Sequence, residues 1–208
     1  MKRILLFLTI VVFSSNSLSA QEFNEEEIRK DVSQYFQYNE KNQMDSLINM
    51  LIPEFVEMFS REFLKSQMEE LVDNANFKVR FRDMKMQEIQ NALQSEESSY
   101  ALVDYEFIME FGFQRSEYQD PADFDSFLQF METSFKSQYG ETEVSLDKEK
   151  SAILVAPHKT ILAVKKPGYD SWKFIDFEPQ NMEMYKTLFG KSVMEKLETI
   201  AGQNYKDD

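Results

Sequence analysis

Cysteine is absent from the sequence, and the chain has only five glycines, five prolines and one histidine, His158. Without cysteine there is neither a disulfide nor a thiol nucleophile, and one histidine falls short of the several ligands that a zinc site needs. A Ser–His pair would have to use His158, which follows Pro157 between two predicted strands and is interpreted as part of a surface turn. No two glycines are spaced for a nucleotide-binding loop. No metal and no cofactor are therefore expected.

Basic residues are also few. The 23 lysines and arginines are outnumbered by 37 aspartates and glutamates, and the formal net charge is −14. A chain this acidic repels nucleic acid and anionic membrane surfaces. We therefore expect no nucleic acid among the partners.

The first twenty residues have the layout of a secretory signal peptide. A short positive segment precedes an apolar run over residues 4–13, and a serine-rich segment ends at Ala20. The run is shorter than the roughly 20 apolar residues that cross a bilayer. We predict a signal peptide over residues 1–20 and a mature chain that begins at Gln21, without a membrane span. No cysteine follows the run to carry a lipid anchor, and a disulfide-free exported protein fits a bacterial periplasm or a secreted protein.

Apolar residues recur at helical spacing in five segments of the remaining chain. Asn24 and Glu27 form a capping box that predicts the start of the first helix. Pro53 and Pro121 stand where a proline is tolerated best, at the first turn of a helix, and Gly140 closes the helix that Pro121 opens. The predicted helices cover residues 24–36, 44–51, 53–72, 120–140 and 182–200.

Alternation with a period of two predicts an antiparallel meander of strands. Strands are expected at 77–86, 100–111, 144–155 (two pieces joined through 147–150), 159–165 and 171–177. The apolar phase of the first strand slips by one residue near Arg82, which predicts a bulge or bend there. Folding the first hairpin about residues 96–97 places Met86 opposite Phe107, Met84 opposite Met109, and Gln87 near Glu106.

The strand over residues 100–111 has one apolar set of side chains and one set that holds three carboxylates. The apolar set is Ala101, Val103, Tyr105, Phe107, Met109 and Phe111; the carboxylates are Asp104, Glu106 and Glu110. Burying three unpaired carboxylates would cost several kcal/mol each. We therefore expect the apolar set to face the helices and the acidic set to face water.

Helices, an antiparallel meander and further helices together predict an α+β fold in one domain over residues 21–180, with a helical extension over 181–208 packed on the same domain. The order of elements, and the closing strand with Trp172 and Phe174, resemble the nuclear transport factor 2-like superfamily, which includes ketosteroid isomerase-like and SnoaL-like domains. The resemblance implies N-terminal helices packed on a curved, cone-like antiparallel sheet. The helix at 120–140 is inserted relative to that pattern, and the helical tail is added.

Members of that superfamily are either enzymes or binding modules without chemistry, so the resemblance alone does not fix the function. The main expectation is a non-catalytic exported protein that binds a small apolar ligand or a protein partner of the cell envelope, with a homodimer as an open alternative. The ligand-binding residues would be Tyr105, Phe107, Met109, Trp172 and Phe174. The alternative is an isomerase-type or hydrolase-type enzyme with Asp104 or Asp176 as base and Tyr105 as hydrogen-bond donor.

Overall fold

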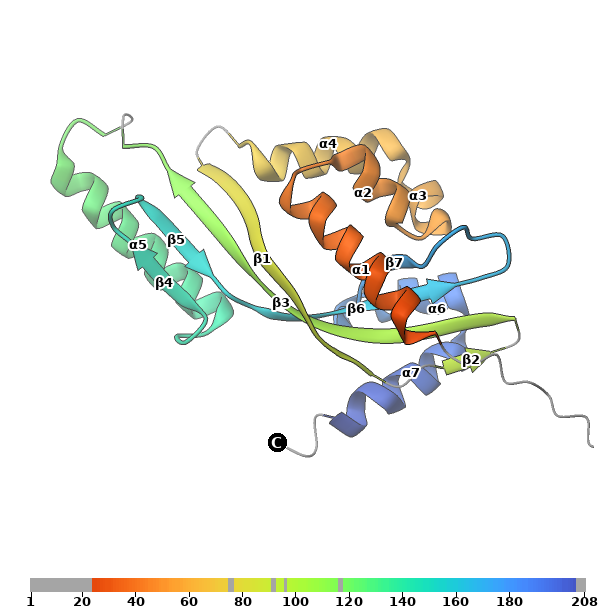
Figure 1. Ribbon diagram of the computed structural model, residues 1–208. Coiled ribbons are helices and arrows are strands. Elements are labelled where there is room, and N and C mark those ends of the chain that lie inside the picture. Colours follow the sequence, from red (N-terminus) through yellow and green to blue (C-terminus); the bar gives the residue numbers. More distant parts are fainter. Residues whose placement is uncertain (1–23, 75–76, 91–92, 96, 116–117, 205–208) are drawn as a thin grey trace, which may run out of the picture.

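In the computed structural model, residues 24–74, 77–90, 93–95, 97–115 and 118–204 are described, and side chains are described up to residue 199. The predicted signal peptide lies outside these residues. The described chain forms an α+β fold, in which helices flank a seven-stranded antiparallel sheet (Figure 1). The predicted fold class is confirmed.

The helices follow the order that the periodicity predicts. Four helices precede the sheet, one lies between its strands and two end the described chain. Their bounds are α1 (Glu25–Glu40), α2 (Met44–Met50), α3 (Pro53–Phe59), α4 (Arg61–Val72), α5 (Pro121–Tyr139), α6 (Met182–Phe189) and α7 (Lys191–Asn204). In these ranges no helix is both long and apolar enough to cross a bilayer.

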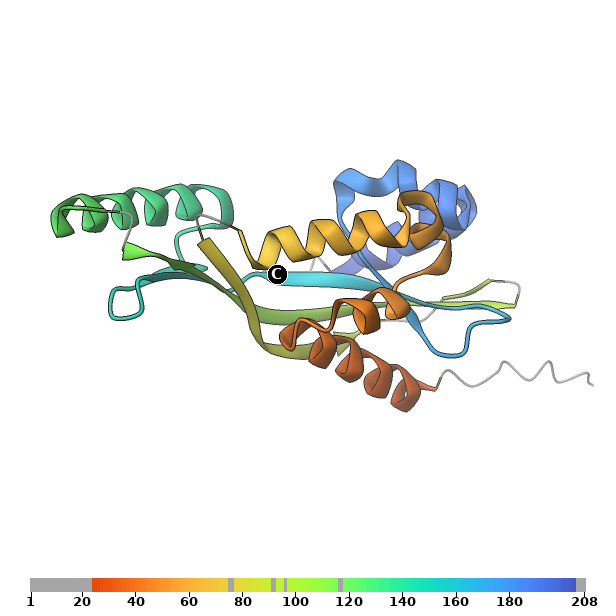
Figure 2. The ribbon, with the colours of Figure 1, turned by 90° about the horizontal axis from the view of Figure 1, so that it is seen from above.

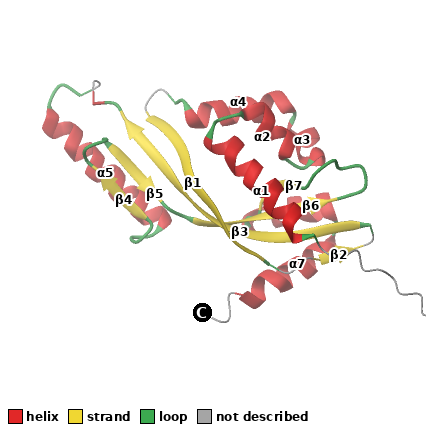
Figure 3. Cartoon of the chain, in the orientation of Figure 1, coloured by secondary structure: helices red, strands yellow, loops and turns green. Residues whose placement is uncertain are grey.

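The sheet is organised around one long central strand, β3 (Ser98–Phe113). The long strand β1 (Phe77–Ile89) and the short β2 (Leu93–Ser95) pair with one of its edges. The other edge pairs with β6 (His158–Lys165) in its first half and with β5 (Ala152–Val155) in its second half. The outer strands are β4 (Val144–Asp147), next to β5, and β7 (Lys173–Asp176), next to β6 (Figure 3).

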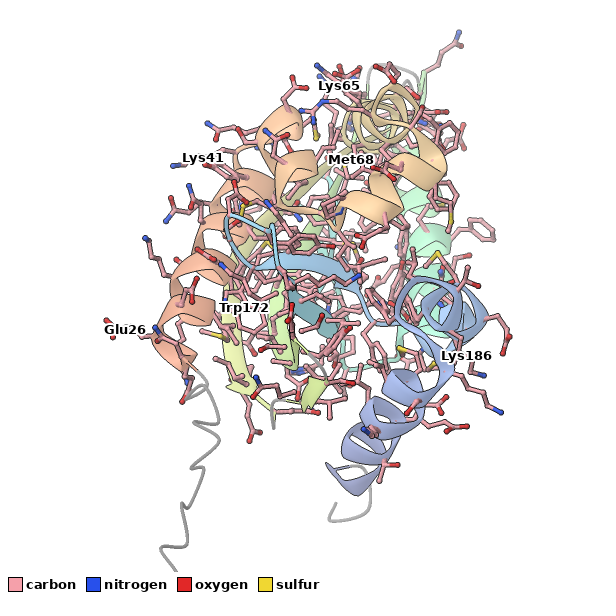
Figure 4. The ribbon with its side chains drawn as sticks, turned by 90° about the vertical axis from the view of Figure 1, so that its right-hand side faces the viewer. Glu26, Lys41, Lys65, Met68, Trp172 and Lys186 are labelled. Carbon is pink, nitrogen blue, oxygen red and sulfur yellow. The ribbon has the colours of Figure 1, made fainter. Side chains whose placement is uncertain are left out.

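One face of the sheet packs on the N-terminal helices and forms the first core with them. Ala101, Val103, Tyr105 and Phe107 of β3 are buried there, as predicted, together with Phe174 of β7 and the apolar positions of α1 and α2. The backbone N–H of Trp172 donates to the buried carboxylate of Asp31 at 2.9 Å, which fixes α1 to the start of β7. Figure 4 shows Trp172 between α1 and the sheet, whereas Lys65 and Lys186 lie at the outer surface.

The same face of β3 reaches a second core farther along the strand. Phe111 and Phe113 have the same side-chain parity as Tyr105, yet they pack on α5 with Val79, Ile153 and Val155. Strands twist about their own axes, so a strand this long turns one face toward different surroundings at its two ends. Figure 2 shows the outcome, with α1 and α5 on different sides of the sheet. Phe81 and Met109 contact both cores.

The opposite face of the sheet is apolar only in the first half of β3. Tyr100 and Leu102 lie there under α6 and α7, with Leu162, Val164 and Ile175 of the neighbouring strands. Beyond Leu102 the same face carries Asp104, Glu106 and Glu110, all partly exposed. The acidic residues on this face therefore border solvent, as predicted. The packing of α6 and α7 over Tyr100 and Leu102, earlier on the same face, was not predicted.

Local signals for helix ends and turns correspond to observed contacts. Asn24 accepts from the N–H of Glu27 at 3.2 Å, and Asp120 accepts from the N–H of Ala122 at 2.8 Å. Pro167 and Gly168 form a turn, in which Gly168 has a φ of 90° and the N–H of Tyr169 donates to the carbonyl of Lys166 at 3.0 Å, as a Pro–Gly pair favours. These features were predictable because both partners lie within four residues of each other.

Two expected segments differ in the structure. The predicted helix 53–72 is two helices, broken at Ser60, whose φ of 63° lies outside the helical region and whose side chain accepts from the N–H of Phe63. His158 does not lie in a turn between strands: it is the first residue of β6, opposite Glu106, and β5 and β6 follow the same edge of β3. Pro157 interrupts this edge without reversing it, because a proline favours an extended residue before it.

The hairpin between β1 and β3 turns where the sequence predicts, but the predicted register of its strands is wrong. Ser95 pairs with Ser98. Farther from the turn the register shifts three times: between Leu93 and Ile89, between Glu88 and Met86, and between Lys85 and Arg82, where Asp83 has a φ of 57°. The last of these shifts confirms the predicted bulge. Because the other two were not predicted, the observed pairs are Met86 with Tyr105, Lys85 with Glu106 and Phe81 with Met109, instead of those expected.

Candidate functional site

An inner cavity of about 200 Å³ lies between the N-terminal helices and the sheet. Its walls come from α1, α2 and α4 on one side and from β1, β3 and β7 on the other. Most of the lining is apolar, and the polar residues are Tyr35, Asn39, Tyr105 and Asp176. The apolar lining consists of Met44, Leu47, Met68, Leu71, Val72, Phe81, Met84 and Phe107.

Tyr105 and Asp176 meet in this cavity, as the enzyme hypothesis required of that pair. The Tyr105 hydroxyl donates to Oδ1 of Asp176 at 3.4 Å. The ring of Tyr105 is held from two sides, since its centroid lies 5.3 Å from that of Phe107 and 5.2 Å from that of Phe36. Its phenol is therefore pre-oriented toward the carboxylate.

The backbone around Asp176 is fixed from the other side of the sheet by α6. The Tyr185 hydroxyl donates to the carbonyl of Asp176 at 2.6 Å and accepts from the N–H of Glu178 at 3.0 Å. The side chain of Lys159 forms an ion pair with that of Glu178. Between Asp176 and Glu178, the N–H of Phe177 donates to the carbonyl of Thr160 at 2.8 Å. The end of β7 is thus held at three consecutive residues, which keeps Asp176 in the cavity wall.

Burial determines the electrostatics of the inner cavity. It raises the pKa of Asp176, an effect that nearby Lys159 opposes and Glu178 reinforces. The side chain of Asp176 is exposed to solvent, although protein atoms surround its carboxylate densely. The surrounding atoms and the mostly apolar lining of the cavity raise its pKa, and its exposure to solvent limits the size of the effect.

The two phenols remain hydrogen-bond donors over the physiological pH range. Burial raises the pKa of Tyr105 well above its usual value, and the negative charge of Asp176 adds to the effect. The pKa of Tyr35 is raised by the same two causes in the same order. The polar part of the cavity therefore presents one carboxylate and two un-ionised phenols.

Asp176→Asn is expected to stabilise the protein at neutral pH. A carboxyl whose folded-state pKa is raised binds its proton more tightly in the folded state, so wild-type stability falls as the pH rises through that pKa. The advantage of the variant should shrink as the pH falls toward about 4, the usual pKa of an unfolded aspartate. Urea unfolding of wild type and Asp176→Asn between pH 4 and 8 measures the difference in stability, and Asp125→Asn, at an exposed position, is the control. An Asp176→Asn protein that is less stable than wild type at every pH would contradict the expectation.

The other predicted site residues are placed elsewhere. Asp104 projects from the opposite face of β3 to its neighbour Tyr105, so the two do not form a base–donor pair. Met109 lies between the first and second cores, and Trp172 and Phe174 are buried against the N-terminal helices without lining the cavity. Of the five predicted ligand-binding residues, Tyr105 and Phe107 line it.

Tyr35 and the methionine lining were not identified from the sequence as site residues. Tyr35 stands on the apolar face of α1, where an aromatic residue is expected to belong to the core. The hydroxyl of Tyr35 on an otherwise apolar face could have marked it as a site residue, as the hydroxyl of Tyr105 did. Met44, Met68 and Met84 come from three separate elements, so only the tertiary structure brings them together.

A second, polar cleft of about 460 Å³ lies mainly on the other face of the sheet, where Asp104 and Thr160 project side by side. It is lined by residues of β1, β3 and the start of β6, and by residues 177–179. Among the residues with described side chains, no group of His, Cys, Asp or Glu is arranged to hold a metal ion. No protein-family model matches the chain, and no curated protein matches its sequence.

Proposed function

We propose that the protein is an exported binding protein of the nuclear transport factor 2-like type, which takes a small, mostly apolar molecule into the inner cavity. The observation that carries the proposal is an apolar lining with one polar end, formed by Asp176 and Tyr105. Small-molecule sites combine apolar walls with a few convergent polar groups and often contain a residue with a shifted pKa. The larger cleft lacks such walls.

Size and polarity restrict the ligand. A closed apolar cavity of about 150 Å³ accommodates benzene, so about 200 Å³ suits a ring with one or two substituents. The Asp176 carboxylate accepts hydrogen bonds, and the Tyr35 phenol is available as a donor beside it. The expected ligand therefore has an apolar body and one hydroxyl or amino group directed at Asp176.

Methionine-methyl NMR tests this binding directly, with p-cresol as the polar probe and toluene as its apolar counterpart. The methyl signals of the lining residues Met44, Met68 and Met84 are expected to shift saturably, while those of exposed Met58 and buried Met194 stay in place. Asp176→Asn should weaken p-cresol binding several-fold and leave toluene binding nearly unchanged. Unshifted lining signals with both probes would refute a ligand site in the cavity.

Native mass spectrometry of protein recovered from a bacterial periplasm tests the remaining parts of the proposal. It reports the cleaved mass, the oligomeric state and any retained ligand in one measurement. A mass that still includes residues 1–20 would overturn the export proposal, and a dimer mass would support the homodimer alternative.

Catalysis is the second candidate function, because a carboxylate and a phenol lie together in an apolar cavity. In the catalytic alternative, Asp176 removes a proton from a carbon atom of the substrate, and a phenol stabilises the oxyanion that develops on the substrate. Tyr105 already donates to Asp176, so Tyr35 would have to serve the oxyanion. Because catalysis would need a second phenol in addition to the Tyr105–Asp176 pair, binding is the better-supported function. Deuterium exchange into 3-cyclohexenone, lost in Asp176→Asn, would establish the catalytic alternative.

A further inference from the structure

We infer that the polar cleft is a second binding site, independent of the inner cavity, for a small organic cation that carries several N–H donors. Its volume of about 460 Å³ lies within the range of small-molecule sites. Asp104, Thr160 and Glu88 occupy equivalent register positions on β3, β6 and β1, so their side chains share one face. The inner cavity lies against the other face, although Tyr105 borders both.

The centre of the cleft is a carboxylate held in a fixed position. Oδ2 of Asp104 accepts from Nε2 of Gln90 at 2.5 Å, and Oδ1 accepts from Oγ1 of Thr160 at 2.6 Å. One bond to each oxygen fixes the plane of the carboxylate. Each oxygen has a further lone pair for a donor from the cleft.

Gln90 supplies a second observation, independent of the acidic residues. Gln90 is only 8% exposed, and because a carboxylate only accepts, its Nε2 rather than its Oε1 faces Asp104. The Oε1 atom is then a buried acceptor with no hydrogen-bond partner in the described part of the chain. Such an atom destabilises a fold unless a donor reaches it. Gln90 lines the cleft, and changes of side-chain rotamer are common on binding, so we assign a donor of the bound ligand as the partner of Oε1.

The charge of the cleft selects a cation. Three carboxylates, those of Glu88, Asp104 and Glu178, border it, and Lys159 is already paired with Glu178. Exposed His158 stands at the edge. The acceptors that remain, Glu88, Asp104 and Gln90 Oε1, favour a ligand with several N–H groups. The described side chains form no metal-binding group, which favours an organic amine over a metal ion.

Isothermal titration with spermidine, at near-physiological salt, tests the assignment. We expect saturable one-to-one binding that Glu88→Gln weakens at least threefold and Asp104→Asn about tenfold. Glu62→Gln, an exposed residue on α4, removes the same charge far from the cleft and should leave binding unchanged. The methyl signals of Met44, Met68 and Met84 should not shift, which separates this site from the inner cavity.

Two results would overturn the inference. The first is no binding, and the second is an equal loss in Glu88→Gln and Glu62→Gln, which would indicate general attraction to an acidic surface. Asp104 bonds to two neighbours, so its variant also requires a melting curve. If Asp104→Asn does not fold, the comparison of Glu88→Gln with Glu62→Gln decides alone, because Glu88 is exposed. Neither result bears on ligand binding in the inner cavity.

Discussion

Phe174→Ala is expected to lower the free energy of unfolding by about 3–5 kcal/mol. Phe174 is fully buried in the first core, and its ring centroid lies 5.1 Å from that of Tyr35. Truncation removes the apolar burial and leaves a hole between α1 and β7. The carbonyl of Phe174 also accepts from the N–H of Ile52 at 3.3 Å, a bond that the variant retains, so the loss reports on side-chain packing.

Urea unfolding followed by circular dichroism and by the fluorescence of the single tryptophan measures this loss. The matched control is Phe130→Ala on α5. The side chain of Phe130 is 67% exposed, so its removal should change stability by less than about 0.5 kcal/mol. Similar losses in both variants would contradict the placement of Phe174 at the centre of the first core.

A chain shortened to end at Glu178 is expected to lose its fold and to aggregate. Among the residues it lacks are Phe189, Val193, Met194 and Leu197, all buried against the sheet. At about 1.5–3 kcal/mol for each buried apolar side chain, their combined contribution is comparable to the total stability of about 5–15 kcal/mol of an ordinary protein. The shortened chain also exposes Leu102, Leu162 and Val164 as a continuous apolar face.

Analytical ultracentrifugation and far-UV circular dichroism test this expectation. A chain that ends at Asn204 is the control, because it retains all of α7 and should remain folded. A folded, monodisperse protein ending at Glu178 would show that α6 and α7 are dispensable for the fold. The Tyr185 bonds to the backbone at Asp176 and Glu178 would be lost in that protein, so it would also test whether the inner cavity needs them.

The parts of the fold that depend on neighbours in sequence were predictable, and those that depend on distant contacts were not. The cap at Asn24 and the turn at Gly168 need only local partners. The bulge near Asp83 was visible as a slip in the apolar pattern, but part of its support is distant, since Glu40 of α1 accepts from the N–H of Met84 at 2.8 Å. The two register shifts nearer the turn, between Leu93 and Ile89 and between Glu88 and Met86, left no mark in the alternation, so the strand pairing derived without them was wrong.

The candidate site was predictable to a similar extent. Tyr105 stood out as a polar tip on an apolar face, and Asp176 as a charge at the end of the last strand. Their contact depends on the pairing of β6 with both β3 and β7, which alternation alone does not specify. Tyr100 and Leu102 share the parity of the acidic residues, and only the packing of α6 and α7 distinguishes them.

The long twist of β3 has a mechanical consequence. A single uninterrupted backbone supplies side chains to all three hydrophobic clusters, and Phe81 and Met109 contact two of them at once. A force that displaces the far end of β3, where Phe111 and Phe113 pack on α5, therefore acts along one continuous strand on Tyr105 in the wall of the inner cavity.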